Sequence, residues 1–366
     1  MKDIAMKYEE RIGFALRELY RRSGYQQFKM RKFEEYDLYA RNKDFLVSDN
    51  IITFTDVNGA LMALKPDVTL SIVRSSRDAA GVQKFCYNEN VYRVSAAARG
   101  FREIPQAGVE CIGDIDDVCI AETLMLAVRS LKTISPDCVL DVSHLDIVSA
   151  LVDALGLEAD TRRDVLRCIG EKNLHELDAL CAGAEPAAVE RLKALVRIGG
   201  TPAEALPKLR ALDCAPAAVD QLAALTDTLA ALGCGDCLRI DFSVVNDMNY
   251  YNGIVFKGFV SGVPAGVLSG GQYDKLMRKM RRVSRAVGFA VYLDMLERIA
   301  GEPEAYDVDT VLLYDGGVPA AALLRAVKTL SAGGESVSAQ KRVPEKLRYR
   351  RLARLSGDEV TFDAHA

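Results

Sequence analysis

Two polar side chains in an otherwise apolar stretch could together bind a small charged ligand. Gln106 and Glu110 lie four residues apart in a segment with the apolar pattern of a β-strand. Side chains two or four positions apart on a strand point the same way, so we expect both to enter one pocket, where an amide and a carboxylate can bind an amino group. Such a pair is more often an ordinary polar strand face, so its assignment depends on the rest of the chain.

Cysteine and histidine offer little further chemistry. Cys234 and Cys237 have CxxC spacing, but no second such pair and no nearby histidine completes a zinc site, so we predict no metal. The other cysteines lie mostly in apolar contexts typical of reduced core thiols. His144, His175 and His365 lie outside every motif described below, so histidine-based nucleophile or base chemistry is not supported.

The bulk composition indicates a globular protein with an ordinary surface. The chain has 366 residues, 49% of them hydrophobic, enough for two or three domains. Its formal charge of -4 gives no overall attraction to nucleic acid or anionic membranes. The basic runs 278–282 and 346–351 could contact phosphate, but solvated helix faces are the commoner explanation. No segment approaches the ~20 apolar residues of a membrane span, so we expect a cytoplasmic protein.

These candidate residues need a sheet to position them. Residues 8–23 have the spacing of an amphipathic helix. Asn58-Gly59 predicts a hairpin turn between strands at 51–55 and 61–64. With further strand patterns at 82–93 and 106–112, these segments predict an antiparallel sheet covered by helices.

The remaining chain divides into three parts. Residues from about 143 to 236 are rich in Ala, Leu and charged residues at helical spacing, which predicts a helical insertion. Strand patterns return at 238–244 and 253–260. We therefore expect an α+β core over 1–300 and a small α/β unit over 305–366. The elements expected in that unit are a strand at 310–314 and a helix at 320–330.

Four separated segments follow one family pattern in the same order. They are Phe54-Thr55-Asp56 with Ala63-Leu64-Lys65-Pro66-Asp67-Val68-Thr69, then Tyr92 to Glu110, then Asn249-Tyr250-Tyr251-Asn252-Gly253-Ile254-Val255-Phe256, then Ser269-Gly270-Gly271-Gln272-Tyr273-Asp274. The chain resembles histidyl-tRNA synthetases over roughly residues 8–300. The last segment is similar to the G-G-R-Y-D turn of that family. The resemblance implies a class II synthetase-like antiparallel sheet flanked by helices.

This resemblance also assigns roles to single residues. It implies that Asp67 and Thr69 hold an amino acid's ammonium group, and that Arg93 meets a carboxylate or phosphate. Tyr251 and Tyr273 would line an imidazole pocket, where rings pack and hydroxyls form hydrogen bonds. The predicted histidine-binding residues are Asp67, Thr69, Arg93, Gln106, Glu110, Tyr250, Tyr251 and Tyr273.

The sequence departs from the synthetases where they handle ATP. Asn246 stands at the position of the signature arginine, and Met295 replaces the arginine that clamps the γ-phosphate. Tyr292 stands where a glycine leaves room for adenine, and Arg99-Gly100 reverses the usual order in the motif 2 loop. Loss of preorganised cations removes the stabilisation of charge that builds up during adenylation. We therefore predict no catalytic residues and no cofactor.

An amino acid pocket kept without ATP or tRNA functions resembles the regulatory subunits of ATP phosphoribosyltransferase. This resemblance implies a non-catalytic homodimer within a hetero-oligomer, with the short-form catalytic subunit as partner and L-histidine as effector. No nucleic acid partner is expected. Whether histidine occupies the ancestral pocket or a subunit interface stays open, as does the role of the C-terminal unit. The alternatives are an active histidyl-tRNA synthetase and another synthetase-like paralogue that binds an amino acid.

Overall fold

The chain divides into two compact units in the computed structural model. One comprises Tyr8–Ile299, and the other comprises Ala300–Ala366 with Met1–Lys7. The structure describes residues 7–43, 46, 51–78, 81–95, 100–244, 250–299 and 306–363.

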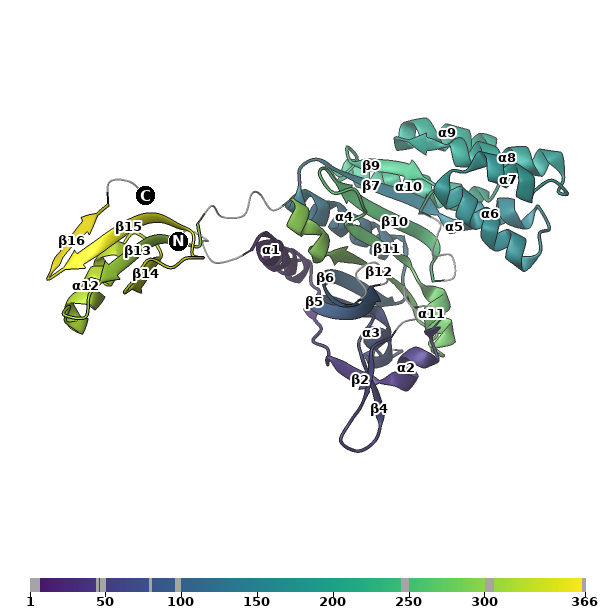
Figure 1. Cartoon of the computed structure of the whole chain (residues 1–366). Helices are drawn as coiled ribbons and strands as arrows, with labels where there is room; N and C mark the ends of the chain where they lie inside the picture. The colour runs from purple at the N-terminus through teal and green to yellow at the C-terminus, as the bar shows by residue number, and fades with distance from the viewer. Residues whose placement is uncertain are drawn as a thin grey trace. The chain divides into compact units, whose positions relative to one another are not determined.

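The first unit is built on a nine-stranded sheet with the order β1-β5-β6-β12-β11-β10-β7-β9-β8 (Figure 1). A long hairpin of β5 and β6 pairs along its whole length, and β6 begins at Gly100, earlier than the strand predicted at 106–112. The strands are β1 (Gln26–Gln27), β5 (Val82–Ser95), β6 (Gly100–Gly113), β7 (Cys138–His144), β8 (Gly199–Gly200), β9 (Leu238–Asp241), β10 (Asn252–Val260), β11 (Leu268–Gln272) and β12 (Arg285–Tyr292).

Three sequence expectations about this sheet were wrong in detail. The sheet is mixed, because β1 pairs with β5 and β7 with β9 in parallel. The segment compared with the G-G-R-Y-D turn is a central strand, β11, up to Gln272. Ser143 and His144, assigned to the start of the insertion, belong to β7, which the sequence analysis missed. His144 ends this strand and caps the next helix by accepting the Asp146 N–H at 3.2 Å.

Helices α1 (Tyr8–Arg22) and α4 (Asp117–Ile134) contact the sheet on one side. The alternation along β6 separates two hydrophobic clusters, because Val109 and Cys111 join the cluster with α1 and α4, whereas Ile112 joins the other. Gln106 and Glu110 lie an even number of positions from Ile112, so both are on the side away from α1 and α4.

A small second sheet and two helices cover that opposite side. The sheet has the order β2-β4-β3, and β3 and β4 form the hairpin predicted around Gly59, whose φ is +82°. Glu34 is buried and accepts hydrogen bonds from Tyr39 Oη at 3.1 Å and Ser71 Oγ at 2.9 Å, which ties β2 to both helices. The elements are β2 (Phe33–Glu35), α2 (Tyr36–Ala40), β3 (Thr53–Thr55), β4 (Leu61–Leu64) and α3 (Thr69–Ser75).

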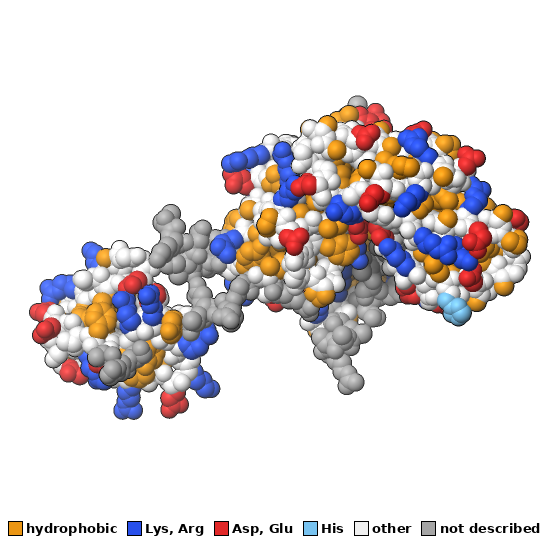
Figure 2. Space-filling model, turned by 90° about the horizontal axis from the view of Figure 1, so that it is seen from above, with side chains coloured by type: hydrophobic (Ala, Val, Ile, Leu, Met, Phe, Trp, Pro, Cys, Tyr) orange, Lys and Arg blue, Asp and Glu red, His pale blue; other side chains and the backbone are white. Residues whose placement is uncertain are grey.

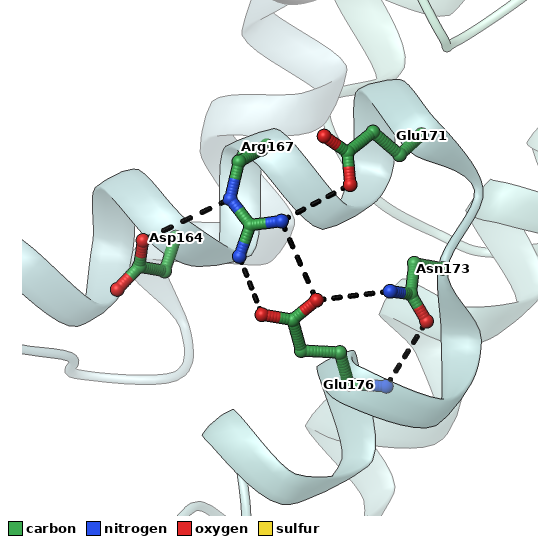
Figure 3. Close-up of polar contacts among 5 residues, drawn as sticks. All are labelled: Asp164, Arg167, Glu171, Asn173 and Glu176. Atoms are coloured by element: carbon green, nitrogen blue, oxygen red, sulfur yellow. Dashed lines mark hydrogen bonds and ion pairs between the residues drawn. The ribbon is translucent and has the colours of Figure 1, made fainter.

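The insertion between β7 and β9 is largely helical. Its helices gather beyond the β7–β9 end of the sheet (Figure 1), and β8 adds a short edge strand. Arg167 ties α6 to α7 by contacting Asp164, Glu171 and Glu176 (Figure 3). The helices are α5 (Leu145–Asp153), α6 (Ala159–Glu171), α7 (Leu174–Leu180), α8 (Pro186–Arg197), α9 (Pro202–Ala211) and α10 (Pro216–Ala231).

The C-terminal unit contains the strand and helix expected from sequence. They are β13 (Val308–Tyr314) and α12 (Ala320–Ser331). β13 pairs in parallel with β14 (Val337–Gln340) and β15 (Tyr349–Ser356), and β16 (Glu359–Phe362) completes a four-stranded sheet. Among the described residues of both units, no helix is long and apolar enough to span a bilayer.

Candidate functional site

Glu110 is the centre of a buried polar cluster. Its side chain is 2% exposed. Thr69 Oγ1 donates to one carboxylate oxygen at 2.7 Å and Tyr273 Oη donates to the other at 2.6 Å. Gly288 faces it from β12, where a Cβ atom would lie 1.9 Å from Glu110 Oε2, so only glycine leaves room for the carboxylate. The sheet thus joins β6, the start of α3 and the end of β11 around one side chain.

The position of Glu110 changes its acid–base behaviour. Burial raises the pKa of Glu110 to about 8, and the nearby Asp67 carboxylate acts in the same direction. The two hydroxyl hydrogen bonds lower this pKa but do not offset the loss of solvent. The free carboxyl is therefore largely protonated near neutral pH, and it becomes an acceptor with both oxygens when a ligand cation displaces that proton.

Three tyrosines form an aromatic wall beside this carboxylate. The Tyr250 and Tyr251 rings meet edge to face with centroids 4.6 Å apart, and the Tyr250 and Tyr273 centroids are 5.9 Å apart. Burial raises the pKa of Tyr250 and of Tyr273, so their hydroxyls stay neutral. The three rings place aromatic surface directly beside the Glu110 carboxyl.

Asp67 and Arg93 lie at the entrance to α3. Asp67 Oδ1 accepts the Leu70 N–H at 2.8 Å, and Arg93 Nε donates to the Pro66 carbonyl at 3.1 Å. Burial raises the pKa of Asp67, although the Leu70 N–H and the Arg93 charge oppose that shift. Both residues therefore hold the turn that presents Thr69.

Gln106 shares the sheet face of Glu110 but is separated from it. Both side chains lie on one face of β6, as their spacing predicted, and both are buried. Between them, a Cβ atom on Gly108 would lie 2.5 Å from Tyr87 Oη, so the Tyr87 ring occupies the space over Gly108. Tyr87 carries no sequence signal for such a role, because a tyrosine in a strand usually indicates packing alone.

A cavity of about 470 Å³ lies alongside this cluster, between the sheet and the insertion. Of the eight predicted residues, Arg93 and Tyr251 line it. Tyr292 and Met295 also line it, and the Tyr292 hydroxyl is 2.7 Å from Ser269 Oγ. Asn246 and Arg99, at which the sequence departs from the synthetases, lie outside the described residues. Other lining residues include Arg102, Ile104, Leu145, Gly170, Val244, Lys257, Phe259 and Asp294.

Arg102 and Asp294 give this cavity charges that the sequence analysis did not identify. Arg102 Nη2 lies 3.0 Å from Asp294 Oδ2. Asp294 Oδ1 is buried and has no hydrogen-bond partner among the described residues. Burial raises the pKa of Asp294, while the Arg102 charge opposes the shift. Arg93, Arg102 and Lys257 could bind an anionic group of a ligand in this cavity. Asp294 Oδ1 could accept a hydrogen bond from the same ligand.

The cysteine pair has no metal-binding surroundings in the described part of the chain. Cys234 and Cys237 are both buried, and Cys237 Sγ donates to the Cys234 carbonyl at 3.6 Å. Within the described ranges, no group of three or more His, Cys, Asp or Glu residues is arranged to hold an ion.

Solved structures share this architecture. The chain superposes with a TM-score of 0.78 on an ATP phosphoribosyltransferase regulatory subunit/histidyl-tRNA synthetase from Bacillus halodurans, at 24% identity, covering 95% of this chain and 93% of the other. An ATP phosphoribosyl transferase (HisG:HisZ) complex from Thermotoga maritima gives a TM-score of 0.62 at 19% identity, covering 78% of this chain and 97% of that chain. These likenesses confirm the class II synthetase-like fold.

Sequence comparisons then define the family. A family model described as Histidyl-tRNA synthetase matches residues 3–296, so the chain belongs to the histidyl-tRNA synthetase family. The ATP phosphoribosyltransferase regulatory subunit of Clostridium kluyveri is 30% identical over 301 residues, which cover 79% of this chain and 77% of that protein. The subunit of the same name from Alkaliphilus metalliredigens is 27% identical over 312 residues, covering 81% and 79%. Within the wider family, the chain belongs with the ATP phosphoribosyltransferase regulatory subunits.

Proposed function

We propose that this protein is the regulatory subunit of a two-chain ATP phosphoribosyltransferase in histidine biosynthesis. It assembles with a short catalytic chain, activates it and transmits feedback inhibition by L-histidine. Relatives bearing this name and a solved HisG:HisZ complex of the same fold support the assignment. The subunit acts as a homodimer within the larger assembly.

The observation that carries the ligand assignment is the buried Thr69–Glu110–Tyr273 cluster. L-Histidine presents an ammonium group and an imidazole ring, which need acceptors and an aromatic surface. Glu110 supplies acceptor oxygens, and Tyr250 and Tyr251 supply the surface. Asp67 and Thr69 at the start of α3 receive the ammonium group, and Arg93 receives the carboxylate. A ligand that binds the active and inhibited assemblies with different affinity shifts the balance between them.

The residues that line the cavity beside this cluster support the proposal that the protein does not catalyse aminoacylation. Met295 gives it a thioether where the synthetase pattern has a phosphate-binding arginine, and a thioether cannot pair with phosphate. Tyr292 also lines the cavity, and its hydroxyl forms a hydrogen bond with Ser269 Oγ. Acidic and basic side chains are interspersed over the face of the first unit seen in Figure 2, and we expect no nucleic acid partner.

Reconstitution with the catalytic chain tests this proposal. We expect the mixture to form phosphoribosyl-ATP much faster than the catalytic chain alone, and L-histidine to inhibit the mixture. Glu110→Gln should keep the activation and raise the half-inhibitory histidine concentration at least about tenfold, since a hydrogen bond to a charged group contributes ~1.5–3 kcal/mol. Glu122→Gln is the control, because Glu122 pairs with Lys84 at a partly exposed position outside this cluster.

Three results would contradict the proposal. One is the absence of any effect on a cognate catalytic chain. Another is equal histidine inhibition of wild type and Glu110→Gln, which would move the histidine site away from this cluster. The third is histidine-dependent pyrophosphate exchange above background, which would identify a working synthetase.

A further inference from the structure

The strand that follows Tyr250 and Tyr251 begins with a bulge. Asn252 lies opposite Gln272, but Val255 lies opposite Gly271, so Gly253 and Ile254 are inserted relative to β11. Gly253 has a φ of +58°, a conformation that favours glycine. Bulges redirect the chain and the side chains beside them. Here the redirected residues are the two tyrosines of the aromatic wall.

Gln272 holds this bulge from the neighbouring strand. Its side chain is 2% exposed, and its Oε1 accepts the Ile254 N–H at 2.8 Å. A Cβ atom on Gly253 would lie 2.3 Å from the same oxygen, so the amide is pressed against the bulged backbone. Without this acceptor, a buried backbone N–H would lose its partner.

Asp274 holds the first residue of the bulge in a similar way. Asn252 Nδ2 donates to Asp274 Oδ2 at 3.0 Å, and the Asp274 N–H donates back to Asn252 Oδ1 at 2.8 Å. Asp274 is itself fixed by the Ala286 N–H, which donates to Oδ1 at 3.0 Å, and by Arg285 Nε at 3.2 Å. The residues on both sides of Tyr273 therefore hold the segment that follows Tyr250 and Tyr251.

We propose that Gln272 and Asp274 are positioning residues that set the spacing of Tyr250 and Tyr251 against Tyr273, and thereby the fit of an aromatic ligand side chain beside Glu110. Gln272 and Asp274 can link the bulge to Tyr273 directly. Each is a chain neighbour of Tyr273, and each forms a hydrogen bond with the bulged segment of β10. Gln272 acts through the backbone and does not touch the ligand. The part of this proposal that concerns histidine depends on the proposed function.

We call the hydrogen bond from the Ile254 N–H to Gln272 Oε1 the brace. Two variants test it: Gln272→Met keeps the length of the side chain and removes its acceptor, whereas Gln272→Glu keeps an acceptor oxygen. We expect Gln272→Met to weaken L-histidine binding to the full-length chain by about tenfold or more, measured by calorimetry. Gln272→Glu should recover most of that loss. Gly253→Ala places a Cβ atom against Gln272 Oε1 and so disrupts the same hydrogen bond from the other strand. It should reproduce the effect of Gln272→Met.

Leu131→Ala is the control for a purely structural effect. Leu131 packs beneath Gly258 on β10, where its Cδ2 would lie 2.7 Å from an added Cβ, so the variant destabilises the same strand without changing the bulge. We expect it to lower the melting temperature and leave histidine affinity within about twofold. Gln272→Met with wild-type affinity, or Leu131→Ala with an equal loss, would overturn the proposal.

Near-ultraviolet circular dichroism separates this inference from the proposed function. The chain has 14 tyrosines and no tryptophan, so its near-ultraviolet signal reports mainly on tyrosine surroundings. Gln272→Met should change the part of this signal that Tyr251→Phe also changes, with or without histidine. If the wild-type protein binds no histidine, the ligand assignment is wrong. The near-ultraviolet signal of Gln272→Met then still tests whether Gln272 positions the tyrosines. An unchanged signal in Gln272→Met would refute it.

Discussion

At the scale of single residues, Glu110 shows how the fold sets the chemistry of a side chain. The carboxyl is buried among Thr69, Tyr273 and the backbone of Gly288, with the Asp67 carboxylate nearby. In water it would ionise well below neutral pH, whereas here its pKa is about 8. Its charge state near neutrality therefore depends on any ligand that approaches it.

This shift predicts a pH dependence of stability. Between about pH 4.5 and 8 the folded carboxyl holds a proton that the unfolded chain releases, so the free energy of unfolding falls as pH rises. Glu110→Gln should remove a contribution on the order of 5 kcal/mol across this window. Chemical denaturation at a series of pH values measures it.

Glu103→Gln serves as the control for this measurement. Hydrogen bonds from Asn90 and Tyr92 lower the pKa of Glu103, so it titrates below the window. The slope above pH 5 should stay that of wild type. If Glu110→Gln also kept the wild-type slope, the proton would be bound elsewhere.

At the scale of elements, the insertion depends on side-chain contacts between its own helices. Its helices are short, and Arg167 of α6 pairs with Asp164 and Glu171 on its own helix and with Glu176 on α7 (Figure 3). Glu176 in this network also accepts from Asn173 Nδ2 at 2.9 Å, beside the cap of α7. A network restricts its side chains more efficiently than an isolated exposed pair, which contributes little.

Arg167→Met should therefore lower the melting temperature by a few degrees at most, more in low salt than in high salt. Arg163→Met is the matched control on the same helix, because Arg163 pairs with exposed Asp160 only three positions away. It should have almost no effect. Equal shifts for both variants, or a shift for Arg167→Met independent of salt, would show that the network does not stabilise the insertion. Differential scanning fluorimetry at two salt concentrations measures both.

At the scale of the whole molecule, the two units have separate hydrophobic cores. The first unit contains two large clusters, whereas the second has a small cluster around Leu312, Ala353 and Leu355. A unit of this size buries little apolar surface and is expected to be marginally stable. We therefore expect calorimetry of the full chain to show two transitions, the smaller unit melting first.

A chain shortened to end at residue 299 extends this prediction. It should keep the upper transition within about two degrees, because the cores of the first unit lie wholly within residues 8–299. Its histidine affinity should equal that of the full chain. A large fall in the upper transition would mean that the first unit needs the C-terminal residues to fold.

Most secondary structure elements of the core, and the family, could be predicted from local patterns and ordered motifs. Local signals fixed the hairpin at Gly59 and the helix ending before Gly24, because a turn or a cap depends on a few neighbouring residues. Ordered motifs identified the synthetase-like fold, and the spacing of Gln106 and Glu110 placed them on one face of β6. β7 was missed because the short strand directly precedes a helical segment and carries too little pattern of its own.

Which side chains meet could not be predicted from the sequence, because it depends on contacts between distant segments. The hydrogen bonds of Glu110 reach residues 41 and 163 positions away, and no spacing along the chain could have predicted them. Tyr87 between Gln106 and Glu110, and the Arg102–Asp294 pair, likewise depend on strand register. The bulge braced by Gln272 depends on pairing between β10 and β11. Contacts between distant segments follow from how the sheet is assembled, whereas local patterns fix only the elements from which it is built.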